Sequence, residues 1–170
     1  KIILTNTFVP DTFTKNEFLK FKVDWLIKSK DLKLIDQFIL NNNNQKIDAN
    51  LLSFYLDDHL AEGDLDDACK IFDKITFLPD DIYTSKFQIY CLIYKNKKEL
   101  AQVQYDLLKE NNFEDKLFES QFNYLMGYSE NKTSKISENK ILDFHLSRLT
   151  SEMFIYEPNE ATNKNIWRYL

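Results

Sequence analysis

Glycine and proline are scarce in this chain. Its 170 residues include only 2 Gly and 3 Pro, against usual shares of about 7% and 5%. So few turn residues exclude a barrel or sandwich built from many short strands. The two glycines, Gly63 and Gly127, stand far apart, so the chain has neither a G-x-G-x-x-G dinucleotide loop nor a phosphate-binding P-loop.

Arginine is also scarce. Only Arg148 and Arg168 are arginines among the 22 basic residues, and the net charge is −5. Arginine is the side chain best suited to bidentate contacts with phosphates and base edges. The composition therefore argues against a nucleic-acid partner.

Long apolar runs are missing as well. No stretch approaches the roughly 18 to 20 apolar residues of a membrane-spanning helix, so we expect no direct membrane insertion. The N-terminus lacks the charged, apolar and small-residue succession of a signal peptide. Because the chain begins at Lys1 rather than Met, we expect a piece cut from a longer protein, whose compartment stays open.

Helix-starting residues recur along the chain. Thr14 followed by Glu17 has capping-box spacing, and Asp31 and Asp48 precede apolar residues with helical periodicity. Gly63 suits the left-handed position just beyond a helix end. No two-residue alternation competes with this pattern. We predict helices over about 15–29, 32–41, 49–62, 65–76, 81–95, 97–110, 114–126, 138–149 and 163–170.

The chain also resembles itself at a period of 33 residues. Apolar residues recur in register at this spacing, which is typical of stacked helical hairpins. In the second helix of each pair the column is Ile35, Ala68 and Ala101, and we expect both alanines to be buried. The columns of the first helices are Phe21, Phe54 and Phe87; Val23, Leu56, Ile89 and Phe122; and Ile27, Leu60, Ile93 and Met126.

One segment carries a family resemblance. The run from Gly63 to Phe72, followed by Pro79, resembles the turn and second helix of a tetratricopeptide-like repeat, with its small residue at Ala68 and its aromatic at Phe72. The resemblance extends over residues 16 to about 110. It implies an all-α fold of stacked antiparallel helical hairpins that form a short right-handed α-solenoid.

The resemblance also implies a division of the chain. We expect hairpin repeats over residues 1–127 and irregular C-terminal helices over residues 128–170, packed on the array, because the polar stretch after Gly127 is longer than a repeat turn. Atypical ends are normal in such arrays.

The two cysteines, Cys69 and Cys91, lie on neighbouring predicted helices joined near Pro79. Antiparallel helices would place them at similar heights, so a disulfide is geometrically possible, and two ordinary buried thiols are the alternative. A disulfide would favour an exported or periplasmic compartment. Without it, a cytoplasmic compartment is expected.

Catalytic and metal-binding patterns are weak. His59 and His145 belong to no H-E-x-x-H motif, and we interpret both as packing residues. We expect no enzyme in this chain, no metal and no cofactor. Asp57 and Asp58 lie near the C-terminal end of the third helix, where negative charge is unfavourable. We interpret both acids as part of a solvated face. The alternative, which their unfavourable position suggests, is contact with a cation or a basic partner.

The tetratricopeptide-like resemblance implies a binding groove lined by every third or fourth residue of the first helices. Tyrosine is enriched in protein interfaces because it combines apolar area with a hydroxyl group. We therefore predict a protein- or peptide-binding scaffold without chemistry of its own. The alternative is a helical superstructure attached to a catalytic domain, such as a cell-wall-degrading one, elsewhere in the chain. The predicted binding residues are Asp24, Asp57, Tyr83, Lys86, Tyr90 and Tyr94.

Overall fold

The computed structural model describes residues 9–170. Residues 1–8, which open the predicted repeat region 1–127, lie outside the described residues. Over the described range the fold is all-α, as predicted, since residues 9–170 contain no strand and only one isolated bridge, between Thr133 and Ser151. The elements are α1 (Lys15–Ser29), α2 (Leu32–Asn41), α3 (Ala49–Ala61), α4 (Leu65–Lys70), the 3₁₀ turn η2 (Ile71–Asp73), α5 (Ile82–Tyr94), α6 (Lys98–Glu110), α7 (Lys116–Met126), α8 (Ile141–Thr150) and α9 (Lys164–Tyr169).

Short polar side chains start the helices where the sequence predicts. The Thr14 hydroxyl accepts a hydrogen bond from the Glu17 N–H at 3.3 Å, and the Glu17 carboxylate accepts one from the Thr14 N–H at 2.8 Å, which completes the capping box of α1. The carboxylates of Asp31 and Asp48 accept first-turn N–H groups of α2 and α3. At the end of α7, Gly127 has a φ of +83°, a left-handed conformation open to glycine without steric cost.

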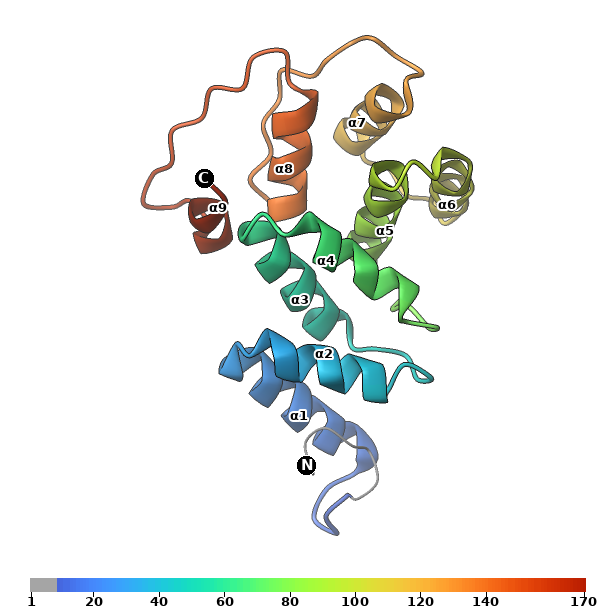
Figure 1. Cartoon of the computed structure of the whole chain (residues 1–170), viewed down its shortest axis with the longest axis vertical. Coiled ribbons are helices and arrows are strands. Elements are labelled where there is room, and N and C mark those ends of the chain that lie inside the picture. Colours follow the sequence, from blue (N-terminus) through green and yellow to red (C-terminus); the bar gives the residue numbers. More distant parts are fainter. Residues whose placement is uncertain (1–8) are drawn as a thin grey trace.

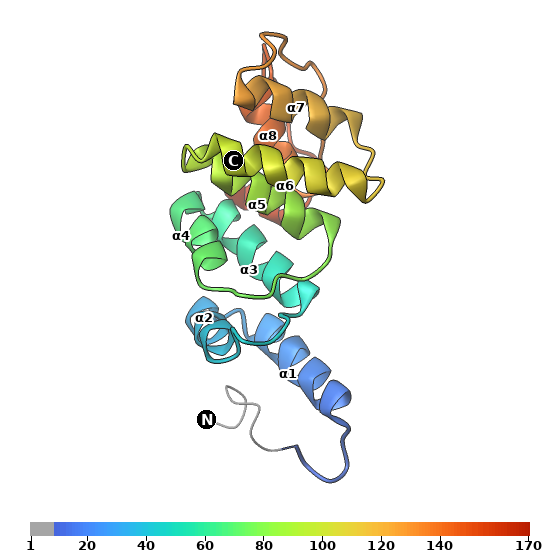
Figure 2. The same cartoon turned by 90° about the vertical axis from the view of Figure 1, so that its right-hand side faces the viewer.

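Helices that are adjacent in sequence pack in pairs. α1 contacts α2, α3 contacts α4, and α5 contacts α6. The first members of the pairs also touch, because α3 contacts both α1 and α5, and α5 contacts α7. These pairs follow one another in chain order along the long axis of the molecule (Figures 1 and 2). None of the described helices is both long and apolar enough to span a lipid bilayer.

The buried core follows two of the predicted columns. Ile35, Ala68 and Ala101 are all fully buried, which confirms the expectation for both alanines. Among the columns of the first helices, one is buried at every position, and its members are Val23, Leu56, Ile89 and Phe122. In the α3–α4 and α5–α6 pairs a buried alanine lets the two helix backbones approach closely, so any larger side chain there would have to displace its neighbours.

Another predicted column does not hold. Phe87 is fully buried, but Phe21, two periods earlier, is 50% exposed. Phe21 lies on α1, the first helix of the described residues, whose main helix contacts are with α2 and α3. The Phe21 ring instead lies against the rings of Phe13 and Phe18, with centroids 6.2 and 6.3 Å away.

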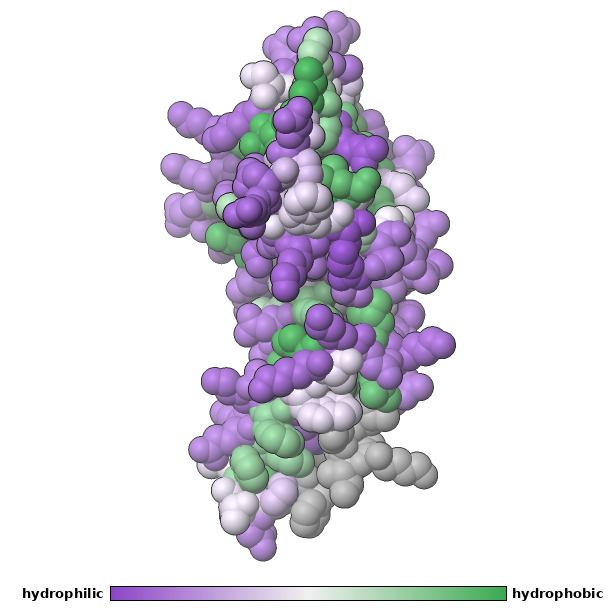
Figure 3. All heavy atoms as spheres, turned by 90° about the vertical axis from the view of Figure 1, so that its left-hand side faces the viewer, coloured by the Kyte–Doolittle hydropathy of each residue, from purple (hydrophilic) through white to green (hydrophobic). Residues whose placement is uncertain are grey.

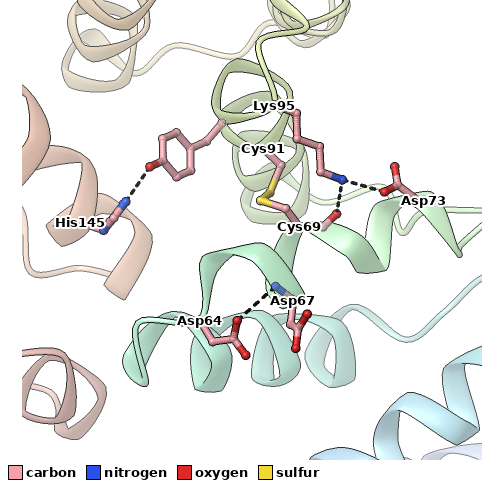
Figure 4. The surroundings of a disulfide bond; sticks show 8 residues. Asp64, Asp67, Cys69, Asp73, Cys91, Lys95 and His145 are labelled. Carbon is pink, nitrogen blue, oxygen red and sulfur yellow. Dashed lines mark hydrogen bonds and ion pairs between the residues drawn. A yellow bond between two sulfur atoms is a disulfide. The ribbon is translucent and has the colours of Figure 1, made fainter.

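Cys69 of α4 and Cys91 of α5 form a disulfide, with their Cα atoms 5.4 Å apart (Figure 4). The predicted pairing across adjacent helices is therefore confirmed. The bridge adds a covalent link between two helix pairs, α3 with α4 and α5 with α6, that otherwise meet through side-chain packing.

The helix that carries Cys69 is shorter than predicted. α4 ends at Lys70 and continues only as the 3₁₀ turn η2, whereas the expected helix ran to residue 76. The Lys95 ammonium donates a hydrogen bond to the Cys69 carbonyl at 3.1 Å and pairs with Asp73 at 2.7 Å (Figure 4). A side-chain donor thus engages the carbonyl that would accept the Asp73 N–H in a continuing α-helix.

The C-terminal residues return to the middle of the molecule. α8 packs on α3 and α7, and α9 packs on α3 and α8. The connection between them, residues 151–163, runs along the outside without helical structure (Figure 1). The side of the molecule on which α9 lies is mostly hydrophilic, with separate apolar side chains among the polar ones (Figure 3).

Because the helices approach closely at Ala68, a larger side chain at this position should destabilise the fold. Ala68→Leu should overpack the contact and lower the free energy of unfolding by roughly 1 to 3 kcal/mol in urea denaturation. Ala161→Leu, at an exposed position, adds the same atoms and should have little effect. Equal stability of the two variants would contradict the close helix approach.

The disulfide predicts a stability that depends on redox state. The 22-residue separation of the cysteines corresponds to about 3 kcal/mol of lost loop entropy in the unfolded chain. Dithiothreitol should lower the urea midpoint of the wild type and leave that of the Cys69→Ala/Cys91→Ala double variant unchanged. An unchanged wild-type midpoint after complete reduction, verified by thiol titration, would contradict a stabilising bridge.

Candidate functional site

Four of the six predicted binding residues meet in one place. Asp57 lies on α3, and Tyr83, Lys86 and Tyr90 follow one another along one side of α5. The Tyr83 hydroxyl donates a hydrogen bond to the Asp57 carboxylate. We call this surface, made by Asp57, Asp58, Tyr83, Lys86 and Tyr90, the α3–α5 face.

The α3–α5 face is not the open groove that the sequence predicted. Lys86 and Tyr90 are only 6% and 5% exposed, because their polar ends contact residues of α8. The expectation that they line a solvent-exposed surface is therefore wrong. The repeat register correctly placed these side chains on one side of α5, but it contained no information that residues 128–170 cover that side.

The other two predicted residues lie apart from this cluster. Asp24 is exposed on α1 and shares a shallow pocket with Asp48 and Asn50 at the start of α3, the opposite end of that helix from Asp57. Tyr94, in the last turn of α5, is 47% exposed. Their predicted roles in binding stay predictions.

Asp57 and Tyr83 form the first polar contact of the face. The Lys140 ammonium lies over the Tyr83 ring, 5.2 Å from its centroid. Burial raises the pKa of the Asp57 carboxyl to about 6, and this effect outweighs the Tyr83 hydrogen bond and the Lys140 charge, which both lower it. The Asp57 carboxyl therefore changes its charge in the mildly acidic range.

Lys86 forms the second contact. Its ammonium pairs with Asp143 of α8 and with Asp115, which precedes α7 and lies 3.2 Å away. The same ammonium lies 4.9 Å from the centroid of the Phe118 ring. Two carboxylates and an aromatic face thus surround one buried cation, and the three groups tie α5 to α7 and α8.

His145 of α8 forms the third contact. Its Nε2 lies 2.7 Å from the Tyr90 hydroxyl, and its Nδ1 lies 2.7 Å from the Tyr169 hydroxyl of α9. A neutral imidazole has one donor and one acceptor nitrogen, so one tyrosine donates to the ring and the other accepts from it. Burial lowers the pKa of His145 to about 4, which keeps the ring neutral above that pH. Figure 4 shows this ring beside α5.

Arg168 of α9 forms the fourth contact. Its guanidinium donates to Asp58 at 2.6 Å and also to Glu62, just beyond the end of α3. Asp58 is therefore not part of a solvated face, as the sequence was interpreted, but contacts a cation, the alternative, and this cation comes from the same chain. The planar fork of arginine suits two carboxylates at once.

Sequence reasoning missed the partners of the face. His145 was predicted to be a packing residue, and it is buried, but its two hydrogen bonds to tyrosines were not foreseen. Asp143 and Arg168 had no local signal, since they meet Lys86 and Asp58 across 57 and 110 positions of sequence. Only the unbalanced acids of α3 pointed to a cation.

The described residues offer no metal site. Over residues 9–170, no group of three or more His, Cys, Asp or Glu side chains is arranged to hold an ion. The polar atoms of the α3–α5 face instead bond to one another and to the C-terminal helices. These contacts hold α8 and α9 against α3 and α5.

The pKa shifts of Asp57 and His145 predict opposite effects of pH on stability. The folded state holds the Asp57 proton more tightly than the unfolded chain, so Asp57 contributes stability that is present below pH 3.8 and lost as the pH rises through 6. His145 behaves oppositely, since its stabilisation is present above pH 6.5 and lost as the pH falls through 4. Each shift of two or more pKa units corresponds to about 3 kcal/mol.

Unfolding free energies of Asp57→Asn and His145→Gln, measured between pH 4 and pH 7, test this prediction against the wild type. On acidification the wild type should gain stability relative to Asp57→Asn and lose stability relative to His145→Gln. Parallel profiles for wild type and variants would show that neither group titrates with a shifted pKa in this range.

The comparisons with known proteins give no further guide to this site. No model of a known protein family, no curated protein and no solved structure matches the chain. The resemblance to tetratricopeptide-like repeats therefore stays a prediction, and the function has to be inferred from the contacts of the chain itself.

Proposed function

We propose that the chain is a non-catalytic scaffold that binds protein segments on the α3–α5 face. In this proposal α1 to α7 form stacked antiparallel helical hairpins of a short right-handed α-solenoid. The pairwise packing of α1 with α2, α3 with α4 and α5 with α6 supports it. So does the successive contact of α1, α3, α5 and α7, because stacked hairpins present their first helices side by side.

One observation carries the proposal. The α3–α5 face holds a short helix, α9, that comes from far along the sequence and is attached by side chains. Ile166 of α9 is fully buried, Tyr169 reaches His145, and Arg168 reaches the acids of α3. An apolar anchor flanked by charge-paired and hydrogen-bonded side chains is the usual anatomy of a protein interface.

The polar groups of the face support binding rather than catalysis. A general base needs a free lone pair within reach of a substrate proton. Both ring nitrogens of His145 are engaged by tyrosine hydroxyls, and Asp57 accepts the hydrogen bond of Tyr83. These groups hold side chains in fixed positions, which suits recognition.

The disulfide favours an exported location for this scaffold. Disulfides persist in oxidising surroundings and are rare in the cytosol. The bridge between Cys69 and Cys91 therefore favours an exported location, in which the scaffold would meet extracellular or periplasmic proteins.

A labelled peptide of residues 159–170, which contains α9, tests the proposal on the full chain. In the wild type the chain's own α9 competes for the face. Arg168→Glu places a negative charge beside Asp58 and Glu62 and should release α9, so the variant should bind the peptide about tenfold more tightly in fluorescence anisotropy.

Lys164→Glu is the matched control, because it makes the same charge change at an exposed position of α9 and should bind the peptide as weakly as the wild type. Peptide binding by Arg168→Glu that is no tighter than that of Lys164→Glu, with both variants folded by circular dichroism, would show that the face does not accept a segment in trans.

A further inference from the structure

A second concave surface lies between α2 and α4, which stand one above the other on the same side of the molecule (Figures 1 and 2). Its volume is about 530 Å³, within the range of sites that enclose ligand groups. We call it the α2–α4 groove. Its walls are residues of α2 and α4, and its floor comes from α3. None of the contacts of the α3–α5 face involves it.

The floor of the groove is aromatic and apolar. The Tyr55 and His59 rings pack edge to face with centroids 4.5 Å apart, and Leu32 borders them. The Tyr55 hydroxyl donates to Asp36 at 3.4 Å. Tyr55 itself is only 4% exposed, so the apolar surface open to an occupant comes mainly from the partly exposed Leu32 and the His59 ring, and it favours apolar side chains.

The walls of the groove carry an excess of positive charge. Lys74 pairs with Asp36 at 3.1 Å, and Lys70 pairs with Asp67 on α4. Both carboxylates are thereby neutralised. Among residues 9–170, Lys33 makes no ion pair, although it lines the same groove. Lys33 is therefore the one charge of the described lining without a carboxylate partner, so the occupant of the groove should combine apolar side chains with a carboxylate.

The chain itself exposes a segment with this chemistry. Residues 153–157 have no helical structure and alternate in exposure, since Met153, Ile155 and Glu157 face solvent while the two residues between them are partly buried. Met153 and Ile155 are 73% and 69% exposed, the two largest values among the exposed hydrophobic residues. The inward rings of Phe154 and Tyr156 lie against Phe144 of α8, with centroids 5.4 and 4.7 Å away.

We propose that the α2–α4 groove binds the 152–157 segment of a second copy of this chain. Met153 and Ile155 would lie on Leu32 and the His59 ring, and the Glu157 carboxylate would pair with Lys33. Within one copy the segment lies against α8 and is not part of the groove lining. The contact is heterologous, because groove and segment are different surfaces, so repetition gives linear oligomers. A segment in a groove buries less than a stable interface of roughly 1,200 Å², so the association is transient.

Sedimentation velocity of the full chain, from micromolar to near-millimolar concentration, tests the proposal. The sedimentation coefficient of the wild type should rise with concentration and fall when salt screens the lysines. Lys33→Glu, which changes the groove, and Met153→Asp, which changes the segment, should each remain monomeric. Lys46→Glu should associate like the wild type, because Lys46 is exposed and pairs with Asp80 outside the groove.

A mixture of the two monomeric variants gives the sharpest result. The Lys33→Glu copy still offers an intact segment, and the Met153→Asp copy still offers an intact groove. The mixture should therefore form dimers and stop there. A wild type that stays monomeric at every concentration, or a mixture that shows no dimer, would overturn the proposal. Both variants change exposed side chains, and their circular dichroism spectra should match that of the wild type.

Discussion

The buried ammonium of Lys86 is the constraint on which the C-terminal half of the structure depends. A lysine that is 6% exposed must keep its carboxylate partners, because removal of one partner from a buried pair typically costs about 3 to 5 kcal/mol. Asp143 and Asp115 can occupy those positions only if α8 and α7 approach α5 in one register. With α8 so placed, His145 reaches Tyr90, and α9 can be received beside it.

The sequence predicted the parts of this fold that depend on local order. Helix starts such as the Thr14 capping box follow from hydrogen bonds between residues three apart, and the Ile35, Ala68 and Ala101 column follows from a repeated packing position. The disulfide was foreseeable because its two helices are neighbours in sequence.

The sequence predicted the residues of the α3–α5 face but not the residues that contact them. The repeat register brought Asp57, Tyr83 and Tyr90 to one face of the molecule, which the structure shows. Their partners belong to residues 140–170, which carry no repeat, and a pairing such as Lys86 with Asp143 spans 57 positions. No periodicity encodes such a contact. Charge imbalance was the remaining signal, because Asp58 lies near a helix end where negative charge is unfavourable, and its partner Arg168 comes from another helix.

The connection between α8 and α9 has a consequence for how the α3–α5 face would exchange occupants. Residues 151–163 form a short tether without helical structure, so α9, once detached, would stay close to the surface that it left. Even a fully flexible tether of this length corresponds to an effective concentration in the millimolar range, and the packing of Phe154 and Tyr156 on Phe144 holds this one close to α8. An outside segment with the same intrinsic affinity would have to reach a similar concentration to occupy half of the molecules. The tether therefore sets an affinity threshold. To displace α9, a competing protein would have to bind the α3–α5 face more tightly than Arg168, Tyr169 and Ile166 do, by making contacts that α9 does not make.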